Sequence, residues 1–208
     1  MIILGSTGSI GTNALNVVRE QGLSVEALVC GSNIELLNTQ IKEFKPKYVA
    51  IRDKSQRHKV NHNNVYFGEQ GILEILELCE SKLVLNALVG FSGLKPTLKA
   101  IKLGKKVALA NKESLVIAGK FIDSKNLITV DSEHFGLWYL LQDKPIKKMI
   151  ITASGGSFRD TPIDKLAKVT VKQALNHPNW SMGAKITIDS ATMTNKLFEL
   201  LEVYHLYG

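Results

Sequence analysis

Short apolar runs alternate with longer amphipathic segments along most of the chain. The short runs, rich in Ile, Val, Leu and Ala, are typical of buried strands, whereas the longer segments repeat their apolar residues at helical spacing. Strands are expected at residues 2–4, 25–29, 48–51, 65–67, 83–90, 106–110 and 127–130. Helices are expected at 12–21, 34–44, 70–80 and 96–103, with two more opening at Asn111 and Ser132. This alternation predicts a doubly wound, mostly parallel, Rossmann-like α/β sheet.

After Pro145 the pattern becomes less regular. β-Branched runs at 148–153 and 185–188 predict two more strands, and helices are expected at 171–175 and 192–206. Residues 157–184 lack clear periodicity and lie between Gly156 and Gly183, an arrangement typical of a flap that closes over a ligand. The sequence therefore predicts two domains, a nucleotide-binding domain at 1–120 and a second α/β domain at 121–208 that carries the flap at 157–184.

The composition favours a folded protein that acts on small molecules. Hydrophobic residues make up 45% and charged residues 22% of the 208, which supports a packed core. The formal net charge of +7 is scattered, so we expect phosphorylated small molecules rather than nucleic acid as partners. No apolar run is long enough to span a membrane, no signal peptide is expected, and Cys30 and Cys79 show no metal or redox spacing. These features predict a cytoplasmic protein without a membrane partner.

A glycine-rich turn follows the first expected strand. The sequence Gly5-Ser-Thr-Gly-Ser-Ile-Gly11 separates strand 2–4 from helix 12–21, which is the order of a nucleotide-binding βα unit. Glycines allow the backbone to approach a pyrophosphate closely, and the start of the helix offers N–H groups. The alternative, a glycine turn that only packs the helix on the strand, fits the same residues.

The turn after the second expected strand favours NADP over NAD. NAD-binding proteins usually carry an acid there for the ribose hydroxyls, but the residues here are Cys30-Gly-Ser-Asn33. Since an acid would repel the 2′-phosphate of NADP, its absence fits NADPH. No Arg or Lys stands at this turn, and Ser32 and Asn33 could donate hydrogen bonds to the phosphate instead.

Two acids and a histidine follow the strand expected at 127–130. Asp131 and Glu133 stand beside Ser132 and His134, at the sheet edge where α/β proteins bind ligands. Neighbouring carboxylates suit Mg²⁺ or Mn²⁺. The alternative, which this stretch alone favours, is a helix start with Asp131 or Ser132 as N-cap and Glu133 as a first-turn acid. Lys112 is expected at the same edge, unless it is an exposed loop lysine.

Two further features allow a functional or a structural interpretation. By helical spacing, Asn195, Lys196 and Glu199 share one face of the last expected helix, where they form either part of a site or a surface salt bridge. Within the expected flap, Trp180 either covers a ligand or is a half-buried core anchor.

Six motifs in this order resemble one enzyme family. They are Gly5-Ser-Thr-Gly-Ser-Ile-Gly11, Asn111-Lys-Glu-Ser114, Val130-Asp-Ser-Glu-His134, Ala153-Ser-Gly-Gly156, His177-Pro-Asn-Trp-Ser-Met-Gly183 and Asp189-Ser-Ala-Thr-Met193. Together they are similar to 1-deoxy-D-xylulose 5-phosphate reductoisomerase, the NADPH enzyme of the non-mevalonate isoprenoid route, over essentially the whole chain. The resemblance implies an NADP-dependent oxidoreductase that converts this ketose phosphate to 2-C-methyl-D-erythritol 4-phosphate with Mg²⁺, Mn²⁺ or Co²⁺.

Carried onto matching positions, the resemblance implies three sets of site residues. The metal ligands are Asp131, Glu133 and Glu199, which form the catalytic set together with Lys112. The NADPH contacts are Thr7, Gly8, Ser9, Ile10, Gly31, Ser32, Asn33, Asn111, Glu113 and Gly183. The substrate contacts are Lys112, Ser132, Glu133, Ser154, His177, Ser190, Asn195, Lys196 and Glu199, with Trp180 closing over the substrate.

The implied chemistry suits these residue types. A divalent ion held by three carboxylates can chelate the adjacent ketone and hydroxyl oxygens of the ketose and stabilise the developing oxyanion. The phosphate-binding set combines one cation with neutral donors, and the flap excludes water.

The chain departs from the family pattern in two respects. The family usually has Asn-Lys-Gly-Leu-Glu where this chain has Asn195-Lys-Leu-Phe-Glu199, with the spacing kept. Family members also continue past the position of Gly208 into the rest of the catalytic domain and a C-terminal helical domain. We therefore expect a fragment with an incomplete catalytic domain that can be inactive alone, and a homodimer for the full-length protein.

Two alternatives stay open at the level of sequence. One is a different NADP enzyme, such as a semialdehyde or homoserine dehydrogenase, in which Asp131 and Glu133 bind no metal. The other is a nucleotide-binding module without catalysis, which would bind NADPH but turn over no ketose phosphate. Metal dependence separates the first from a reductoisomerase, and turnover itself separates the second.

Overall fold

All strands of the described residues lie in one parallel sheet. The structure is a computed structural model that describes residues 1–141 and 145–208. The strands are β1 (Ile2–Leu4), β2 (Ala27–Cys30), β3 (Tyr48–Ile51), β4 (Val65–Phe67), β5 (Leu83–Asn86), β6 (Lys106–Leu109) and β7 (Leu127–Thr129). Their order is β4-β3-β2-β1-β5-β6-β7, and every neighbouring pair is parallel. This arrangement confirms the predicted Rossmann-like fold class.

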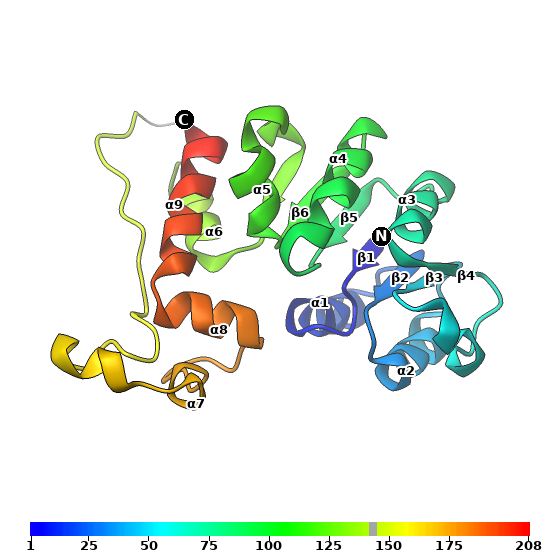
Figure 1. The fold of residues 1–208 in the computed structure, drawn as a ribbon. Coiled ribbons are helices and arrows are strands. Elements are labelled where there is room, and N and C mark those ends of the chain that lie inside the picture. The colour runs from blue at the N-terminus through cyan, green and yellow to red at the C-terminus, as the bar shows by residue number, and fades with distance from the viewer. Residues whose placement is uncertain (142–144) are drawn as a thin grey trace. The chain divides into compact units, whose positions relative to one another are not determined.

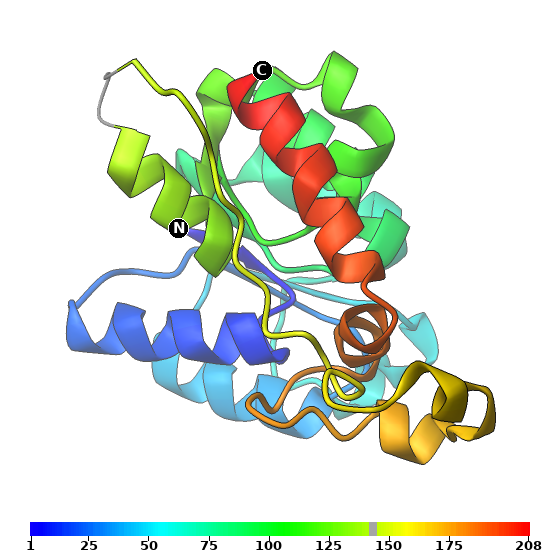
Figure 2. The same ribbon diagram turned by 90° about the vertical axis from the view of Figure 1, so that its left-hand side faces the viewer.

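Helices cover both faces of this sheet. They are α1 (Ser9–Glu20), α2 (Ile34–Phe44), α3 (Gly68–Leu78), α4 (Leu94–Lys102) and α5 (Lys112–Ala118), with short 3-10 turns η1 (Lys54–Lys59), η2 (Gly90–Gly93), η3 (Gly119–Phe121) and η4 (Ser124–Asn126). Figures 1 and 2 show α1 and α2 on one face and α3, α4 and α5 on the other. The buried side chains of Leu15 and Leu37 from the first pair pack against Ile3 and Leu28 of the sheet.

The described residues group into two compact units that meet between Asp131 and Ser132. The two units are Met1–Asp131 and Ser132–Gly208. Strand β7 pairs with β6, with Leu109 opposite Thr129, so the sheet of the first unit extends past the expected boundary. The second unit contains α6 (Ser132–Leu141), η5 (Ile163–Lys168), α7 (Val171–Ala174), α8 (Ala184–Ala191) and α9 (Thr194–Tyr207).

The strand predicted at 185–188 is wrong, because these residues lie in α8. The β-branched run indicated a strand, but local contacts and packing against α9 favour the helix. Gly183 is the N-cap, Thr187 Oγ1 donates to the Gly183 carbonyl at 2.9 Å, and Lys185 pairs with Asp189 at 2.6 Å. Tertiary packing and side-chain pairing thus override weak β propensity.

The strand predicted at 148–153 is not formed either. These residues are not in a strand or helix in the structure. A strand needs a neighbour to satisfy its backbone groups, and the described part of the second unit contains no other strand.

The short helix expected at 171–175 and the helix expected at 192–206 are confirmed by α7 and α9. None of the helices in residues 1–141 and 145–208 is long and apolar enough to cross a membrane.

A buried polar network supports the sheet next to the ligand edge. Asn86, at the end of β5, is fully buried; its amide donates to the Gly93 carbonyl at 2.8 Å and to Thr97 Oγ1 at 2.7 Å. The side-chain oxygen Oδ1 of Asn86 accepts a hydrogen bond from Leu88 N at 3.2 Å. Because buried polar groups are costly to leave unpaired, these contacts fix the loop after β5 against α4.

We expect Asn86→Leu to lower the free energy of unfolding by about 1–3 kcal/mol, because it removes the network's central amide and leaves its partners unpaired. Urea denaturation measures the change. The matched control is Asn13→Leu on the exposed side of α1, for which we expect a change within about 0.5 kcal/mol. Equal stability of the two variants would show that the network does not support the fold.

Candidate active site

The glycine turn after β1 requires glycine for the backbone to fold as it does. Gly5 has a φ of +87°, and a Cβ placed on it would lie 2.6 Å from the Ala87 carbonyl oxygen. A Cβ on Gly11 would collide with the backbone of Gly5. The N-cap of α1 is Gly8, and no side chain caps the helix, so the first N–H groups of α1 face a position that an anion can take. The turn therefore both packs α1 on the sheet and offers a phosphate cradle.

The end of β2 lies beside this turn. Thr7 Oγ1 and Cys30 Sγ are 3.3 Å apart, which links the glycine turn to β2. Asn33 caps α2, since its Oδ1 accepts a hydrogen bond from Leu36 N at 3.2 Å, while Ser32 is exposed. Next to Gly31 a pocket opens at the carboxyl ends of β2 and β3. Its lining includes Val29, Ile51, Ile72, Leu88, Arg52 and Glu69.

The start of α5 places Asn111 and Lys112 at the same sheet edge. Asn111 is fully buried and its amide donates to the carbonyls of Leu88 and Gly90, so this side chain holds the loop after β5. Lys112 Nζ lies 2.6 Å from an Asp131 carboxylate oxygen, and the two side chains are only 8% and 19% exposed. The alternative of an exposed loop lysine is therefore wrong.

In the second unit, a lysine lies between two carboxylates. Lys196 Nζ is 3.4 Å from Glu133 Oε1, contacts Glu199 Oε2, and donates to the Thr152 carbonyl. Glu199 is 1% exposed, so the surface salt bridge considered from the sequence is wrong. Glu133 stands in the first turn of α6, as the alternative for this stretch predicted, and its carboxylate also faces Lys196.

A small pocket adjoins this cluster within the second unit. Its lining includes Ser154, Ser190, Asn195 and Lys196, together with Glu133 and Met193. Met193 has a φ of +62° and precedes the first turn of α9, so the N-terminus of that helix opens toward the pocket. Hydroxyls, an amide, a lysine and a helix N-terminus together form a set of donors for a phosphate.

Two backbone features build this pocket. A Cβ on Gly156, whose φ is +68°, would collide with the Ser190 carbonyl, so glycine allows this segment to lie against the end of α8. Ser190 reaches the pocket from a helix end and not, as predicted, from the end of a strand. Five of the lining residues were expected from the sequence as substrate contacts: Glu133, Ser154, Ser190, Asn195 and Lys196. Met193 was not expected to line the pocket, because no sequence pattern signals its backbone conformation.

His177 organises the turn that leads to Trp180. Its Nδ1 accepts hydrogen bonds from the backbone N–H groups of Asn179 and Trp180, at 3.1 Å and 3.0 Å. The ring proton therefore lies on Nε2, which donates to Ser154 Oγ at 3.1 Å. His177 thus positions one of the pocket's hydroxyls and holds the conformation of residues 177–180.

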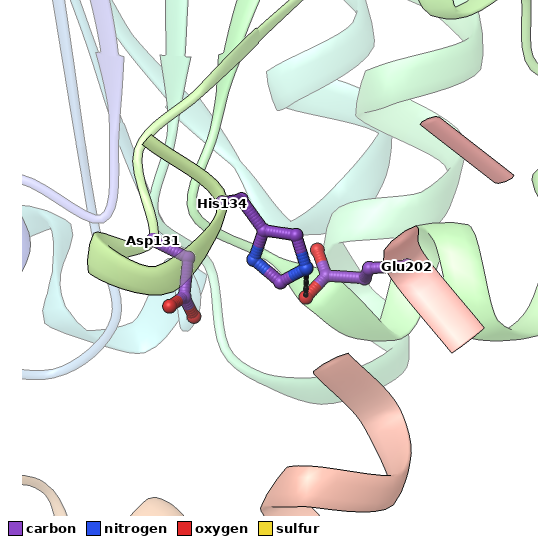
Figure 3. Close-up of side chains that lie close together, drawn as sticks. All are labelled: Asp131, His134 and Glu202. Carbon is purple, nitrogen blue, oxygen red and sulfur yellow. Dashed lines mark ion pairs between the residues drawn. The ribbon is translucent and has the colours of Figure 1, made fainter. Parts of the chain in front are cut away.

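A buried histidine and glutamate connect α6 with α9 in the second unit. His134 Nε2 donates to the Glu199 carbonyl at 3.1 Å and lies 3.7 Å from Glu202 Oε2, as Figure 3 shows for the two side chains. Tyr207 donates to the His134 carbonyl at 3.1 Å. These contacts fix the backbone that carries Glu199. Sequence reasoning did not single out Glu202, although its spacing places it next to Glu199 on the same helix face.

Several expected contact residues of the second unit do not line its pocket, namely Ser132, His177, Trp180, Gly183 and Glu199. Trp180 is 63% exposed, which excludes the half-buried core anchor considered from the sequence. Gly183 is the N-cap of α8. The remaining predicted nucleotide contacts lie at the starts of two helices of the first unit: Thr7, Ser9 and Ile10 at α1, and Glu113 at α5. Ser132, a predicted substrate contact, donates a hydrogen bond to Glu133 Oε2 at 2.7 Å.

Comparison with known sequences gives one result for both units. A profile described as 1-deoxy-D-xylulose 5-phosphate reductoisomerase matches residues 1–119, and one for the C-terminal domain of that reductoisomerase matches 127–207. The reductoisomerase of Nautilia profundicola is 56% identical over all of this chain, and that of Campylobacter jejuni subsp. jejuni is 58% identical. The chain spans 59% and 58% of the lengths of these two relatives.

Solved structures agree with the sequence comparison. A DOX-P reductoisomerase in complex with NADPH, fosmidomycin and magnesium matches with a TM-score of 0.88 at 36% identity, over 99% of this chain and 57% of that one. The 1-deoxy-D-xylulose 5-phosphate reductoisomerase of Zymomonas mobilis in complex with NADPH matches with a TM-score of 0.83, also at 36% identity, over 99% of this chain and 57% of that one.

Proposed function

Because the chain belongs to the 1-deoxy-D-xylulose 5-phosphate reductoisomerase family, we propose that its protein is an NADPH- and divalent-metal-dependent reductoisomerase. It isomerises and reduces 1-deoxy-D-xylulose 5-phosphate to 2-C-methyl-D-erythritol 4-phosphate. The observation that carries the proposal is the pocket of the second unit, where the phosphate-donor set adjoins Glu133 and Glu199. Since the chain spans only part of its relatives, the activity is proposed for the full-length protein.

The carboxylates fit a divalent cation. The Lys196 ammonium lies between Glu133 and Glu199, which supports the proposal that these carboxylates attract a cation. Glu199 is almost fully buried, and a buried carboxylate needs a cation. We propose that Asp131, two residues before Glu133 in the chain, completes a ligand set of three carboxylates with these two. Hard oxygen ligands of this kind suit Mg²⁺, Mn²⁺ or Co²⁺.

The first unit fits NADPH. The glycines at positions 5 and 11 let the turn and α1 pack closely on the sheet, because a Cβ at either position would collide with backbone atoms, and the uncapped start of α1 supplies N–H donors for a phosphate. We propose that residues 7–10, 31–33, Asn111 and Glu113 line the path of the dinucleotide, with Gly183 contributing from the second unit. Solved structures of relatives in complex with NADPH support this assignment.

The residues of this chain have separable tasks in the reaction. Ser154, Ser190, Asn195 and Lys196 bind the phosphate and anchor the substrate, so that its ketone end is held at the carboxylates. When bound, the ion supplies charge stabilisation for the oxygens during rearrangement, and NADPH supplies the hydride. Lys112 orients the Asp131 carboxylate through its 2.6 Å contact. His177 holds Ser154 in place, and the flap at 157–184 excludes water.

We expect Lys196→Gln in the full-length protein to lower kcat/KM by roughly 10- to 100-fold, mostly through a higher KM. The reason is that the variant loses one charge-assisted contact to the substrate phosphate. Steady-state kinetics measures the effect. Lys185→Gln on α8 is the control: it removes a lysine that pairs with Asp189 and does not line the pocket. An unchanged KM in Lys196→Gln would remove this lysine from the phosphate site.

The proposal as a whole is tested by NADPH oxidation with 1-deoxy-D-xylulose 5-phosphate, measured for this chain and for the full-length protein. We expect turnover by the full-length protein that stops with a chelator and returns with Mg²⁺ or Mn²⁺. Turnover that persists without metal would favour a different NADP enzyme. NADPH binding without turnover by the full-length protein would favour a binding module.

Two further expectations remain proposals for the full-length protein. We propose a homodimer, which the family resemblance implies and analytical ultracentrifugation tests. We also propose a cytoplasmic protein whose partner is a phosphorylated ketose and not nucleic acid or a membrane. Fractionation of cells that express it at its natural level tests the location.

A further inference from the structure

We propose that Arg52 selects NADPH over NADH by pairing its guanidinium with the 2′-phosphate of the cofactor. This inference rests on the proposed function, because it assigns a residue to the same nucleotide site. From the sequence, the turn after β2 lacks an acid but also lacks any Arg or Lys for the phosphate. The structure supplies the missing cation from the neighbouring strand.

The register of the sheet brings Arg52 to the turn after β2. Strand β3 is parallel to β2, with Ile51 opposite Cys30. The residues that follow them, Arg52 and Gly31, are therefore neighbours as well. The backbone N–H of Arg52 donates to the Gly31 carbonyl at 3.3 Å. A Cβ placed on Gly31 would lie 3.7 Å from Arg52 Nη2, so the guanidinium extends over this glycine. Ser32 and Asn33 follow directly in the chain.

The guanidinium is available for an anion. Arg52 is exposed, and across residues 1–141 and 145–208 its side chain has no carboxylate partner. Glu69, the acid in the lining of the nearby pocket, is paired with Lys95 at 2.5 Å. The pocket therefore presents a free fork of N–H donors and a neutralised acid. Arginine binds phosphate through two parallel hydrogen bonds, which gives this arrangement its specificity.

Two neighbouring cations, Arg57 and Lys54, make other contacts. Arg57 donates to the carbonyls of Val60 and His62, at 3.2 Å and 2.9 Å, and thereby stabilises its own loop. Lys54 Nζ lies over the ring of Phe67, 5.8 Å from its centroid. Among the cations of this loop, Arg52 is the one whose side chain reaches over Gly31.

The pocket beside Arg52 fits the rest of an adenosine. Apolar side chains of Val29, Ile51, Ile72 and Leu88 line it, and Arg52 stands at the same pocket. A flat base gains free energy by leaving water for such a surface. With the base in the pocket and the pyrophosphate at the start of α1, the ribose would be bound at the turn after β2, where Arg52 is within reach of a 2′-phosphate.

The test is calorimetric titration of the purified chain with NADPH and with NADH. We expect the wild-type chain to prefer NADPH. In Arg52→Gln, the affinity for NADPH should fall by roughly 10- to 100-fold, while the affinity for NADH should stay within about twofold. Arg52→Lys should recover part of the preference, because it keeps the charge but loses the fork. Lys59→Gln, on the same connection between β3 and β4, controls for the loss of one positive charge.

Each outcome decides between specific claims. If Arg52→Gln keeps the wild-type preference, or loses NADPH and NADH affinity equally, Arg52 does not select the cofactor, although the proposed function stands. If the wild-type chain and the full-length protein bind neither nucleotide, both the proposed function and this inference are wrong. Urea denaturation of Arg52→Gln should match the wild type, because the exposed side chain makes no contact that the fold needs.

Discussion

Asp131→Asn in the full-length protein should lower the metal-dependent rate by at least about 1,000-fold and leave the affinity for NADPH nearly unchanged. An amide has the shape of the carboxylate but lacks its charge, so the ion would lose one of the three anionic ligands proposed for it and several kcal/mol of transition-state stabilisation. The same change removes the ion pair with Lys112, which lies 2.6 Å away. Steady-state kinetics at several Mn²⁺ concentrations, with calorimetry for NADPH, measures both effects.

Asp123→Asn is the matched control for this variant. Asp123 is exposed in the same unit and caps η4 by accepting a hydrogen bond from Lys125 N at 3.0 Å, which asparagine can also do. We expect wild-type kinetics from it. Normal metal-dependent rates in Asp131→Asn would show that the three-carboxylate ligand set is wrong, whereas a parallel loss of NADPH binding would indicate a folding defect.

Trp180→Ala should raise KM and lower kcat together, for a combined loss of roughly 10- to 100-fold in kcat/KM, without changing metal affinity. Trp180 is 63% exposed, so its large apolar surface would gain contacts if a ligand came under it. Because His177 Nδ1 accepts a hydrogen bond from Trp180 N, we expect this turn to keep its shape when the flap at 157–184 closes. A loss confined to kcat would contradict closure over the substrate.

The closure itself can be observed by fluorescence. The chain has two tryptophans, so Trp138→Phe leaves Trp180 as the single reporter. Addition of fosmidomycin, which a solved relative binds together with NADPH and magnesium, should shift the Trp180 emission to shorter wavelength as the ring leaves water. An emission that stays at the solvent-exposed position in the presence of saturating ligand would show that 157–184 does not close.

The sequence was most informative for the strands of the sheet and the helices that pack on them. Residues 34–44, 48–51 and 65–67 were predicted with the bounds that the structure has, because their apolar pattern follows from burial on one or both faces. Ends of other elements differ by a few residues. At the start of α1, for example, the helix begins at Ser9 and not at residue 12, since the glycine turn is shorter than the glycine spacing implied.

The second unit was harder to predict because its contacts are tertiary. The Ile186-Thr-Ile188 run has strand propensity, but Lys185 and Asp189 pair across one helical turn and the segment packs on α9. The packing of this segment on α9 overrides its strand propensity, and no local sequence pattern reports that packing. The residue identities at the site were nevertheless accessible, because Ser190 lines the pocket whether it ends a strand or a helix.

Some neighbours from different elements could not be predicted from the sequence, although the meeting of Lys112 with the cluster at Asp131 was expected. Arg52 and Gly31 come together only through the register of β2 and β3, which no motif encodes. Likewise, the contact of His134 with Glu202 depends on how α6 and α9 pack. Motifs therefore identified residues that line the pocket, whereas neighbours such as Arg52 and Glu202 became visible only with the fold.

The central claim is that the full-length protein rearranges the carbon skeleton before it reduces the substrate. The most direct measurement is NMR of the product formed from ¹³C-labelled 1-deoxy-D-xylulose 5-phosphate with NADPH and Mn²⁺. We predict a branched product, 2-C-methyl-D-erythritol 4-phosphate, formed in equal amount to the NADPH oxidised. An unbranched deoxypentitol phosphate, produced by reduction of the ketone without rearrangement, would contradict the account.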